Sequence, residues 1–277
     1  MGDRDYYEKN GYVVCRNLVS TDLVDKLVSL YKEQIVPSKE NFFRQMTNKF
    51  EPNDVTDFGY VKQDFLDVHN YKNFPEFSTT VKEILCGDAI QNNLKQITGS
   101  KSLNLMQSLV FDVSRETLAH HDSYYLDTEP AGNAIAVWIA LEDINEKAGR
   151  FYVVPNSTEI YSQIERPDMS HWEWMSTMHG YFEANLKDKL YAPDLHKGDV
   201  VFWNSRLIHG ALPILDQSFS RKSLTSHFIP SEYKHQTPFM TKEFIECEPY
   251  NGVKIYTATV IQSTEWSSKE MTHAQGQ

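Results

Sequence analysis

Apolar and polar positions alternate with a helical period in the first third of the chain. One such run consists of Leu23, Leu27, Leu30 and Tyr31. Ser20 is a suitable N-cap before this run and Pro37 would end it, so we expect a helix between them. Residues 78–86 and 88–98 repeat the pattern, and each is followed by a glycine that can stop a helix. The first hundred residues are therefore expected to be mainly helical.

Between these helical runs, residues 39–75 are aromatic and polar without a clear period, and such a long irregular stretch often forms a functional lid. From residue 103 onward the pattern changes to short apolar runs separated by turn residues. The expected strands are Leu103–Val113, Ala134–Leu141, Arg150–Val154, Asp199–Trp203 and Arg221–Ile229. Strands at this spacing favour a barrel or jelly roll, and helices that precede strands are an α+β order. We expect a mainly β fold with the N-terminal helices packed on one sheet.

The expected strand 134–141 has two different faces. One face carries Ile135, Val137, Ile139 and Leu141, and the other carries Ala134, Ala136, Trp138 and Ala140. The branched aliphatic face is suited to burial against the helices. The face of small residues leaves room inside the barrel, which favours a ligand cavity over a filled core.

Composition limits the partners of the protein. The net charge of −11 argues against a nucleic-acid-binding face, which needs clustered Lys and Arg. Cys15, Cys86 and Cys247 lie far apart and form neither a zinc motif nor a disulfide framework, as expected in a reducing compartment. The sequence has no apolar run of membrane-spanning length and its first residues lack a signal-peptide pattern. We expect a soluble, cytoplasmic protein that acts on a small molecule, with no nucleic-acid or membrane partner.

The segment His120-His121-Asp122 carries the strongest chemical signal. On a strand, His120 and Asp122 point to the same face, whereas His121 points away and is the weaker ligand candidate. His209, from a distant segment, would complete a set of two imidazoles and one carboxylate. Such a set leaves positions open for substrates and is diagnostic of non-haem Fe(II) oxygenases. Zn(II) accepts the same ligands, so a zinc hydrolase and a non-catalytic metal- or ligand-binding barrel remain alternatives.

A 2-oxoglutarate co-substrate would also need a cation for its far carboxylate. Arg221 lies on the strand expected after His209, and Ser223 shares its face. An arginine fork matches a carboxylate with two parallel hydrogen bonds, so Arg221 and Ser223 are the candidate anchors. With Fe(II) and O2, 2-oxoglutarate would be converted to succinate and CO2 while a C–H bond is oxidised.

Together these motifs resemble the phytanoyl-CoA dioxygenase (PhyH) family, from residues 10–14 to 226–228. The strongest blocks are His120-x-Asp122 with Tyr125, residues 137–143, Gly149 through Ser157, and residues 198–202 leading to His209. The resemblance implies a double-stranded β-helix fold, with Fe(II) at His120, Asp122 and His209 and 2-oxoglutarate at Arg221. It also implies that Trp138, and Gln107 or Leu109 on the strand before the motif, line the co-substrate site.

The sequence departs from the family pattern at Asn156, where the family usually has glycine; asparagine tolerates the same left-handed backbone. Halogenating members replace the iron carboxylate with a small residue, so Asp122 favours hydroxylation or a related oxidation of an unactivated C–H bond. No basic cluster fits the phosphates of an acyl-CoA. The substrate is expected to be another small or medium-sized metabolite.

Several aromatic and basic residues are candidates for a lid or for substrate contact. Tyr125 follows the metal motif, and an aromatic-rich stretch lies between the two metal-bearing segments. The candidates are Tyr125, Trp172, Trp174 and His179, with Tyr60 and Lys62 from the irregular early region. A helix packed on the barrel and a solvated lysine are the plainer interpretations.

These observations predict one domain over residues 1–265, helical over 1–100 and a barrel over 101–265. A lid insertion is expected at about 160–192. Residues 266–277 are expected to form a flexible tail.

Overall fold

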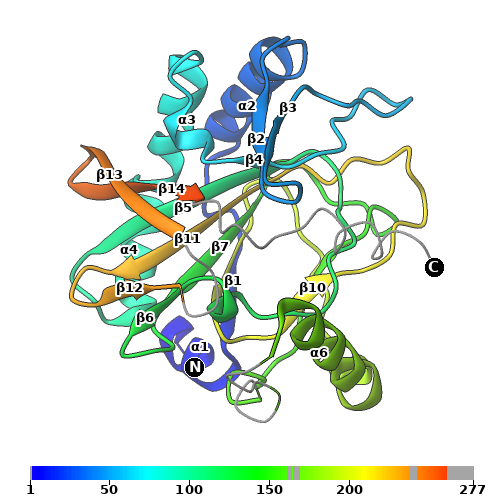
Figure 1. Ribbon diagram of the computed structural model, residues 1–277. Helices are drawn as coiled ribbons and strands as arrows, with labels where there is room; N and C mark the ends of the chain where they lie inside the picture. The colour runs from blue at the N-terminus through cyan, green and yellow to red at the C-terminus, as the bar shows by residue number, and fades with distance from the viewer. Residues whose placement is uncertain (1, 161–163, 165–168, 238–241, 261–277) are drawn as a thin grey trace.

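The computed structural model describes residues 2–160, 164, 169–237 and 242–260 (Figure 1). Within them the main element is an eight-stranded sheet in the order β1-β9-β7-β11-β5-β14-β13, with β4 paired to β5. Its strands are β1 (Tyr12–Cys15), β4 (Phe65–Leu66), β5 (Leu103–Phe111), β7 (Ile135–Ala140), β9 (Val200–Asn204), β11 (Ser223–Pro230), β13 (Lys242–Tyr250) and β14 (Val253–Val260). Neighbouring strands are antiparallel except β14 and β5, which are parallel.

A smaller sheet lies across from the inner face of the main sheet. It pairs β8 (Phe151–Val153) with β10 (His209–Ala211), and single bridges from His120 to His209 and from Tyr191 to Val153 widen it. One apolar cluster joins side chains of both sheets: Ala136, Trp138, Val201 and Trp203 with Phe151 and Val153. Two facing sheets with a shared core form the double-stranded β-helix that the sequence predicts.

The helices of the first hundred residues pack on the outer face of the main sheet. They are α1 (Asp3–Asn10), α2 (Thr21–Leu30), α3 (Pro75–Leu85) and α4 (Asp88–Thr98). The largest core cluster combines apolar residues of α2, α3 and α4 with Ile135, Val137 and Ile139 of β7. In Figure 1, α2 and α3 lie at the top, away from β10 and α6 (His171–Asn185) at the lower right. The aliphatic face of β7 packs against the helices as predicted. The face of small residues was expected to line a cavity, but Ala136, Trp138 and Ala140 belong to the apolar cluster between the two sheets.

Local chemistry explains the helix ends. The Ser20 hydroxyl accepts a hydrogen bond from the Leu23 amide at 3.4 Å, which caps α2. The chain then continues as the π-helix η1 (Tyr31–Ile35) before Pro37. Helix α3 begins at Pro75, earlier than the predicted residue 78, because a proline fits the first helical turn, where its missing N–H costs nothing.

The prediction that the first hundred residues are mainly helical was wrong in part. They also contain β1, β4, the hairpin of β2 (Phe42–Arg44) and β3 (Lys49–Glu51), and the 3-10 helix η2 (Val68–Asn70). The stretch 39–75 is built into the core only in part: Phe42 and residues 64–69 are buried and β4 pairs with β5, whereas most of residues 46–59 are exposed. Strands of two to four residues are too short to show a period of two, so the pattern did not reveal them.

Five other strands were not named from the sequence: β6 (Asp127–Glu129), β10, β12 (Lys234–Gln236), β13 and β14. The hairpin of β13 and β14 extends the main sheet beyond β5. Asn156 has a φ of 62°, the left-handed conformation expected from its place in the turn. The predicted lid region contains α6 and the 3-10 helix η4 (Lys187–Lys189), and the predicted tail at 266–277 lies outside the described residues.

Candidate metal and co-substrate centre

The two candidate metal histidines are joined by their backbones. The amide of His120 donates to the carbonyl of His209 at 3.0 Å, and the amide of His209 donates back at 2.9 Å. The prediction that His120 and Asp122 share a strand was wrong, because His120 makes this single bridge and Asp122 begins the 3-10 helix η3 (Asp122–Tyr124). The tight turn nevertheless brings the Asp122 carboxylate back toward the two imidazoles.

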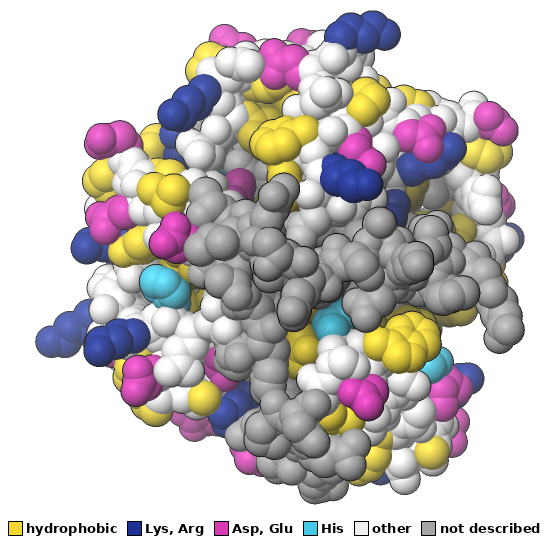
Figure 2. Space-filling view, in the orientation of Figure 1, with side chains coloured by type: hydrophobic (Ala, Val, Ile, Leu, Met, Phe, Trp, Pro, Cys, Tyr) yellow, Lys and Arg dark blue, Asp and Glu magenta, His cyan; other side chains and the backbone are white. Residues whose placement is uncertain are grey.

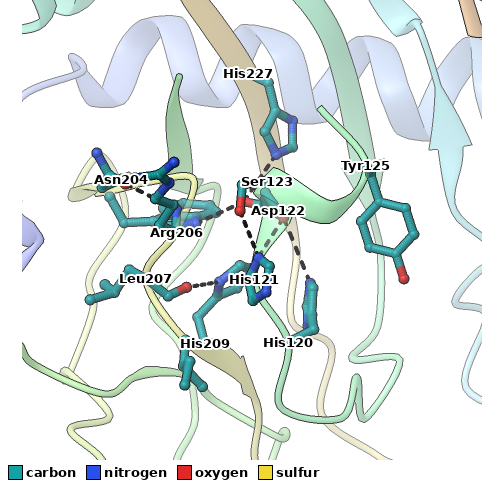
Figure 3. Close-up of polar contacts among 12 residues, drawn as sticks. His120, His121, Asp122, Ser123, Tyr125, Asn204, Arg206, Leu207, His209 and His227 are labelled. Atoms are coloured by element: carbon teal, nitrogen blue, oxygen red, sulfur yellow. Dashed lines mark hydrogen bonds and ion pairs between the residues drawn. The ribbon is translucent and has the colours of Figure 1, made fainter. Parts of the chain in front are cut away.

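The ligand atoms of these three residues converge on one point, as Figure 3 shows. Asp122 Oδ1 lies 3.7 Å from His120 Nε2 and 3.5 Å from His209 Nε2, and all three ligand atoms lie within 4.8 Å of one another. Ligands bound at about 2.1 Å from one ion would lie about 3 to 3.5 Å apart, so the cluster is slightly wider than a loaded site.

Hydrogen bonds orient both imidazoles. His120 Nδ1 lies 2.8 Å from the Leu118 carbonyl oxygen, and His209 Nδ1 lies 2.9 Å from that of Leu207. Because a carbonyl only accepts, Nδ1 of each neutral ring carries the proton and Nε2 keeps its lone pair. This second contact fixes the tautomer that a metal-binding histidine needs.

The protonation states also suit a metal. Burial lowers the pKa of His120 to about 3 and lowers the pKa of His209 as well, so both are neutral at pH 7. Burial opposes ionisation of Asp122, but His209 and His227 facing its oxygens outweigh this effect and hold the pKa of the carboxyl below its usual value. Two neutral imidazoles and one carboxylate are the donor set of a non-haem iron site.

The second oxygen of Asp122 has partners that the sequence did not reveal. Trp203 Nε1 donates to Oδ2 at 2.9 Å, and His227 Nε2 lies 3.2 Å from the same atom. Gln107 Nε2 lies 2.9 Å from His227 Nδ1. The parity of β11, which places His227 on the face of Arg221 and Ser223, was the available signal. The sequence alone favoured a hydrogen-bonded core histidine.

Arg221 lies just before β11, and 5% of its surface is exposed. Its guanidinium carbon lies 5.8 Å from the centroid of the Trp138 ring. Burial lowers the pKa of Arg221 to about 10, so it remains a cation at pH 7. Within the part of the chain that the structure describes, no carboxylate lies within ion-pairing distance of it. A buried cation without a counter-charge is costly, and an anionic ligand would remove that cost.

Other buried polar atoms on the same barrel face also have no hydrogen-bond partner among the described residues. They are Arg221 Nε, Ser223 Oγ, Thr225 Oγ1 and Gln107 Oε1. The strand register places Thr225 beside Leu109 on one side and beside Trp138 on the other. Unpaired buried donors and acceptors are rare in proteins and call for a ligand or water. The Arg221 nitrogen and the two hydroxyls can donate to a carboxylate and so fit an anionic co-substrate, whereas the Gln107 oxygen can only accept. Thr225 was missed from the sequence although it shares the parity of Ser223.

The structure brings the predicted co-substrate residues together, with different contacts. Gln107 is the register partner of His227, and its amide nitrogen is hydrogen-bonded to that ring. Leu109 and Trp138 are both buried. Trp138 stacks on Phe151 at a centroid distance of 5.9 Å as well as facing Arg221.

Helix α6 packs beside the metal-bearing turn. Trp174 is buried and stacks on Tyr124 at 3.9 Å, and the Tyr125 hydroxyl lies 2.9 Å from His171 Nε2. Trp172, in contrast, is 59% exposed, and His179 is half-buried. The helix therefore docks on η3 and the adjacent Tyr125 through Trp174 and His171. His121 is buried too, and its Nδ1 contacts Ser123 Oγ at 2.7 Å.

Tyr60 and Lys62 make their contacts elsewhere. The Tyr60 hydroxyl donates to the Ser218 carbonyl at 3.0 Å, and the Lys222 ammonium lies 4.6 Å from the centre of the Tyr60 ring. Lys62 pairs with Asp54 at 3.1 Å, and its side chain is 48% exposed. This is the solvated lysine of the plainer interpretation.

Two further observations concern possible partners. Among the described helices, none has the length and apolar character needed to cross a membrane. On the face drawn in Figure 2, basic and acidic side chains are interspersed around its edges, and a histidine reaches the surface near the middle.

Comparison with known proteins identifies similar sequences and folds. The family model "Phytanoyl-CoA dioxygenase (PhyH)" matches residues 7–223. Peroxisomal phytanoyl-CoA dioxygenase of Mus musculus is 25% identical over 244 residues, which covers 83% of this chain and 68% of the relative. A probable phytanoyl-CoA dioxygenase of Caenorhabditis elegans is 26% identical over 242 residues, covering 81% of this chain and 73% of the relative.

Solved structures share the fold at lower identity. The epimerase SnoN, crystallised with Fe3+, alpha ketoglutarate and nogalamycin RO, has a TM-score of 0.62 at 17% identity and covers 85% of both chains. EctD from S. alaskensis, with 2-oxoglutarate and 5-hydroxyectoine, has a TM-score of 0.59 at 15% identity, covering 85% of this chain and 78% of the other.

Proposed function

The chain belongs to the phytanoyl-CoA dioxygenase (PhyH) family, and from this we propose that His120, Asp122 and His209 hold the Fe(II) of a 2-oxoglutarate-dependent oxygenase. As a member of this family it is a non-haem iron dioxygenase that uses 2-oxoglutarate and O2. The donor set supports the assignment of the metal ligands, because the neutral imidazoles and the ionised carboxylate face one point.

Bound there, Fe(II) would supply the redox chemistry that couples decarboxylation of 2-oxoglutarate to oxidation of a C–H bond. The residues of the chain would bind and orient the metal ion and 2-oxoglutarate. Both histidines keep Nε2 free of protons through their Nδ1 contacts. His209 and Asp122 are buried, whereas the His120 side chain is 14% exposed.

Arg221 is the proposed anchor of 2-oxoglutarate, and its unpaired buried guanidinium is the observation that carries this proposal. A carboxylate placed between Arg221, Ser223 and Thr225 would supply the missing counter-charge and pair their orphaned polar atoms. Trp138 would form an apolar wall beside it, which keeps the ion pair dry and therefore strong. The Arg221 guanidinium lies beside Trp138, on the inner face of the barrel.

The primary substrate is proposed to be a small or medium-sized metabolite that is hydroxylated or otherwise oxidised at an unactivated C–H bond. Structural neighbours were crystallised with nogalamycin RO and 5-hydroxyectoine, which differ widely, so the shared fold does not select a substrate. The acyl-CoA in the names of the relatives is not carried over, because the sequence shows no basic cluster that fits its phosphates. Tyr125 and α6 are the proposed substrate-side contacts. The expected cytoplasmic location stays a prediction.

The test is anaerobic titration of the protein with Fe(II) and 2-oxoglutarate. We expect the weak visible charge-transfer band of an iron chelate in the wild type, no band in Asp122→Ala, and a large loss of 2-oxoglutarate affinity in Arg221→Ala. Absence of the band in the wild type would count against the iron assignment. An Arg221→Ala variant with unchanged affinity would exclude the anchor.

Turnover in air then separates this reaction from its alternatives. Succinate release that rises with one member of a metabolite panel would identify the substrate. Activity that needs Zn(II) and no 2-oxoglutarate would instead support a hydrolase, and binding without succinate would support a non-catalytic barrel.

A further inference from the structure

The Asp122 carboxylate contacts side chains of two strands in the main sheet, Trp203 of β9 and His227 of β11, and Gln107 of β5 contacts His227. We propose that His227, oriented by Gln107, and Trp203 are positioning residues that leave Asp122 only one oxygen, Oδ1, for the metal. This inference rests on the proposed metal site, and it assigns to these residues a task that the ligand motif does not describe.

The two carboxylate oxygens have separate surroundings. Oδ1 faces the ligand nitrogens of His120 and His209 at 3.7 and 3.5 Å. Oδ2 accepts the Trp203 indole N–H at 2.9 Å. It also lies 3.2 Å from His227 Nε2 (Figure 3). Rotation of the carboxylate to present Oδ2 to a metal would break both contacts at once.

The hydrogen-bond pattern assigns the tautomer of His227. A carboxylate only accepts, so the imidazole nitrogen that faces Asp122 must carry the hydrogen. In the neutral ring Nδ1 is then an acceptor, and it lies 2.9 Å from the amide nitrogen of Gln107, which donates. Every contact in the series Gln107, His227, Asp122 thus has one donor and one acceptor.

We call Gln107, Trp203 and His227 the clamp on Asp122. The clamp orients the Asp122 carboxylate, which the backbone does not do. Asp122 lies on a 3-10 turn rather than in a strand, so no sheet ladder fixes its direction. Gln107 on β5, Trp203 on β9 and His227 on β11 lie within the main sheet and are buried. Gln107 and His227 are also register neighbours, which limits the freedom of both side chains.

The number of carboxylate oxygens on the metal decides how many positions remain. An octahedral ion with two imidazoles and one carboxylate oxygen keeps three positions, whereas a chelating carboxylate leaves two. A 2-oxoglutarate chelate takes two, so the third exists only when Asp122 binds through one oxygen. The clamp on Oδ2 therefore preserves the position that the oxygenase reaction requires.

The experiment measures metal binding rather than turnover. Fe(II) affinity is determined anaerobically by calorimetry, and Co(II) serves as a probe whose visible absorption depends on coordination number. The removal variants are His227→Leu and Trp203→Phe. The rescue variant is His227→Gln, because a glutamine amide nitrogen lies about as far from Cα as imidazole Nε2 and can donate to Oδ2. The control is Ser226→Ala, a buried neighbour on the opposite face of β11.

We expect His227→Leu to weaken Fe(II) binding by about 10- to 100-fold, as is usual when a partner of a metal ligand is lost. The Co(II) spectrum should change in both removal variants, while His227→Gln and Ser226→Ala should keep the wild-type spectrum and bind Fe(II) within about threefold of wild type. The proposal is overturned if His227→Leu and Trp203→Phe both bind Fe(II) like the wild type with its spectrum, or if His227→Gln behaves like His227→Leu.

Asp122→Ala distinguishes failure of this inference from failure of the metal site. If that variant also keeps wild-type Fe(II) affinity, the proposed ligand set is wrong. If it loses Fe(II) while the clamp variants do not, only the positioning role fails. Should His227→Leu not fold, Trp203→Phe and Gln107→Leu test the same contacts from the other two strands.

Discussion

At the scale of single residues, Arg221 and Lys222 are neighbouring buried cations that differ in their partners. Lys222 is 7% exposed and lies on the helix side of the sheet, where its ammonium pairs with Asp112 at 3.0 Å and Glu142 at 3.4 Å. Arg221 points to the barrel interior without a described counter-charge. Alternation along the chain thus separates a structural cation from one that is available to a ligand.

This contrast predicts opposite effects of removing the two charges. In the ligand-free protein, Arg221→Met should raise the free energy of unfolding by about 1 to 2 kcal/mol, because an uncompensated buried charge is removed. The same change should weaken 2-oxoglutarate binding by about 100-fold or more. Denaturant unfolding without ligand and calorimetric titration with 2-oxoglutarate measure the two effects.

Lys222→Met is the matched comparison. It leaves Asp112 buried without its cation and should lower the free energy of unfolding by about 3 to 5 kcal/mol. If both variants destabilise the ligand-free protein equally, Arg221 has a partner after all and the anchor argument fails.

At the scale of elements, His69 in η2 connects two strands of the main sheet, β5 and β14. Its Nε2 lies 2.9 Å from the Tyr256 carbonyl oxygen, and its Nδ1 lies 2.6 Å from Ser108 Oγ on β5. Asp67 adds a second link, because its carboxylate accepts from the Thr257 hydroxyl at 2.6 Å and from the Ala258 amide at 2.8 Å. Buried polar contacts therefore fix β14, which pairs with β5 at one parallel position.

The His69 contact predicts a pH dependence of stability. Burial lowers the pKa of His69 below 6.5 in the folded protein. Between pH 6.5 and that lower pKa, only the unfolded chain binds a proton on the His69 imidazole. Stability is therefore lost as the pH falls below about 6.5. His69→Gln, which can still donate to Tyr256, should lose less free energy of unfolding between pH 7 and 5, by at most about 2 kcal/mol.

Urea unfolding of wild type and His69→Gln at several pH values, with a chelator present, measures the difference. The chelator keeps metal binding from adding its own pH dependence. Equal losses in the two proteins would mean that folding does not lower the pKa of His69.

At the scale of the whole molecule, the candidate metal centre joins the two sheets. His120 and His209 belong to the edge of the small sheet, while the partners of Asp122, Trp203 and His227, belong to the main sheet. A metal ion at this junction would link the small sheet to the main sheet. It binds only the folded arrangement, so it should stabilise the entire domain rather than one turn.

Loading the site should consequently raise the melting temperature. Anaerobic Fe(II) with 2-oxoglutarate, each at about 100 times its dissociation constant, contributes about 2.7 kcal/mol per independent site. For a chain of this size the expected rise is on the order of 5 °C or more over the chelated protein. Asp122→Ala should show no comparable rise. A similar rise in that variant would place the stabilising metal elsewhere.

The candidate metal ligands could be predicted because their chemistry is local in the sequence. The residue types at His120, Asp122 and His209 and the parity of Arg221 and Ser223 are readable without coordinates, as are the two faces of β7. The clamp on Asp122 was not readable, because Gln107, Trp203 and His227 meet only after three strands pair. The same limit hid β1 and β4, which are too short to show a period and are strands only because β9 and β5 complete their hydrogen bonds.

The sequence by itself determined which groups could bind a metal and a carboxylate, since residue identity sets charge and donor type. It also determined helices α2, α3 and α4 and the two different faces of β7, since hydrophobic periodicity is local. Only the tertiary structure decided that Asp122 reaches the histidines from a 3-10 turn, that Arg221 is left without a described counter-charge while Lys222 is paired, and that His227 supports the carboxylate. Burial and pairing depend on what other segments bring to the same point, and no single segment carries that information.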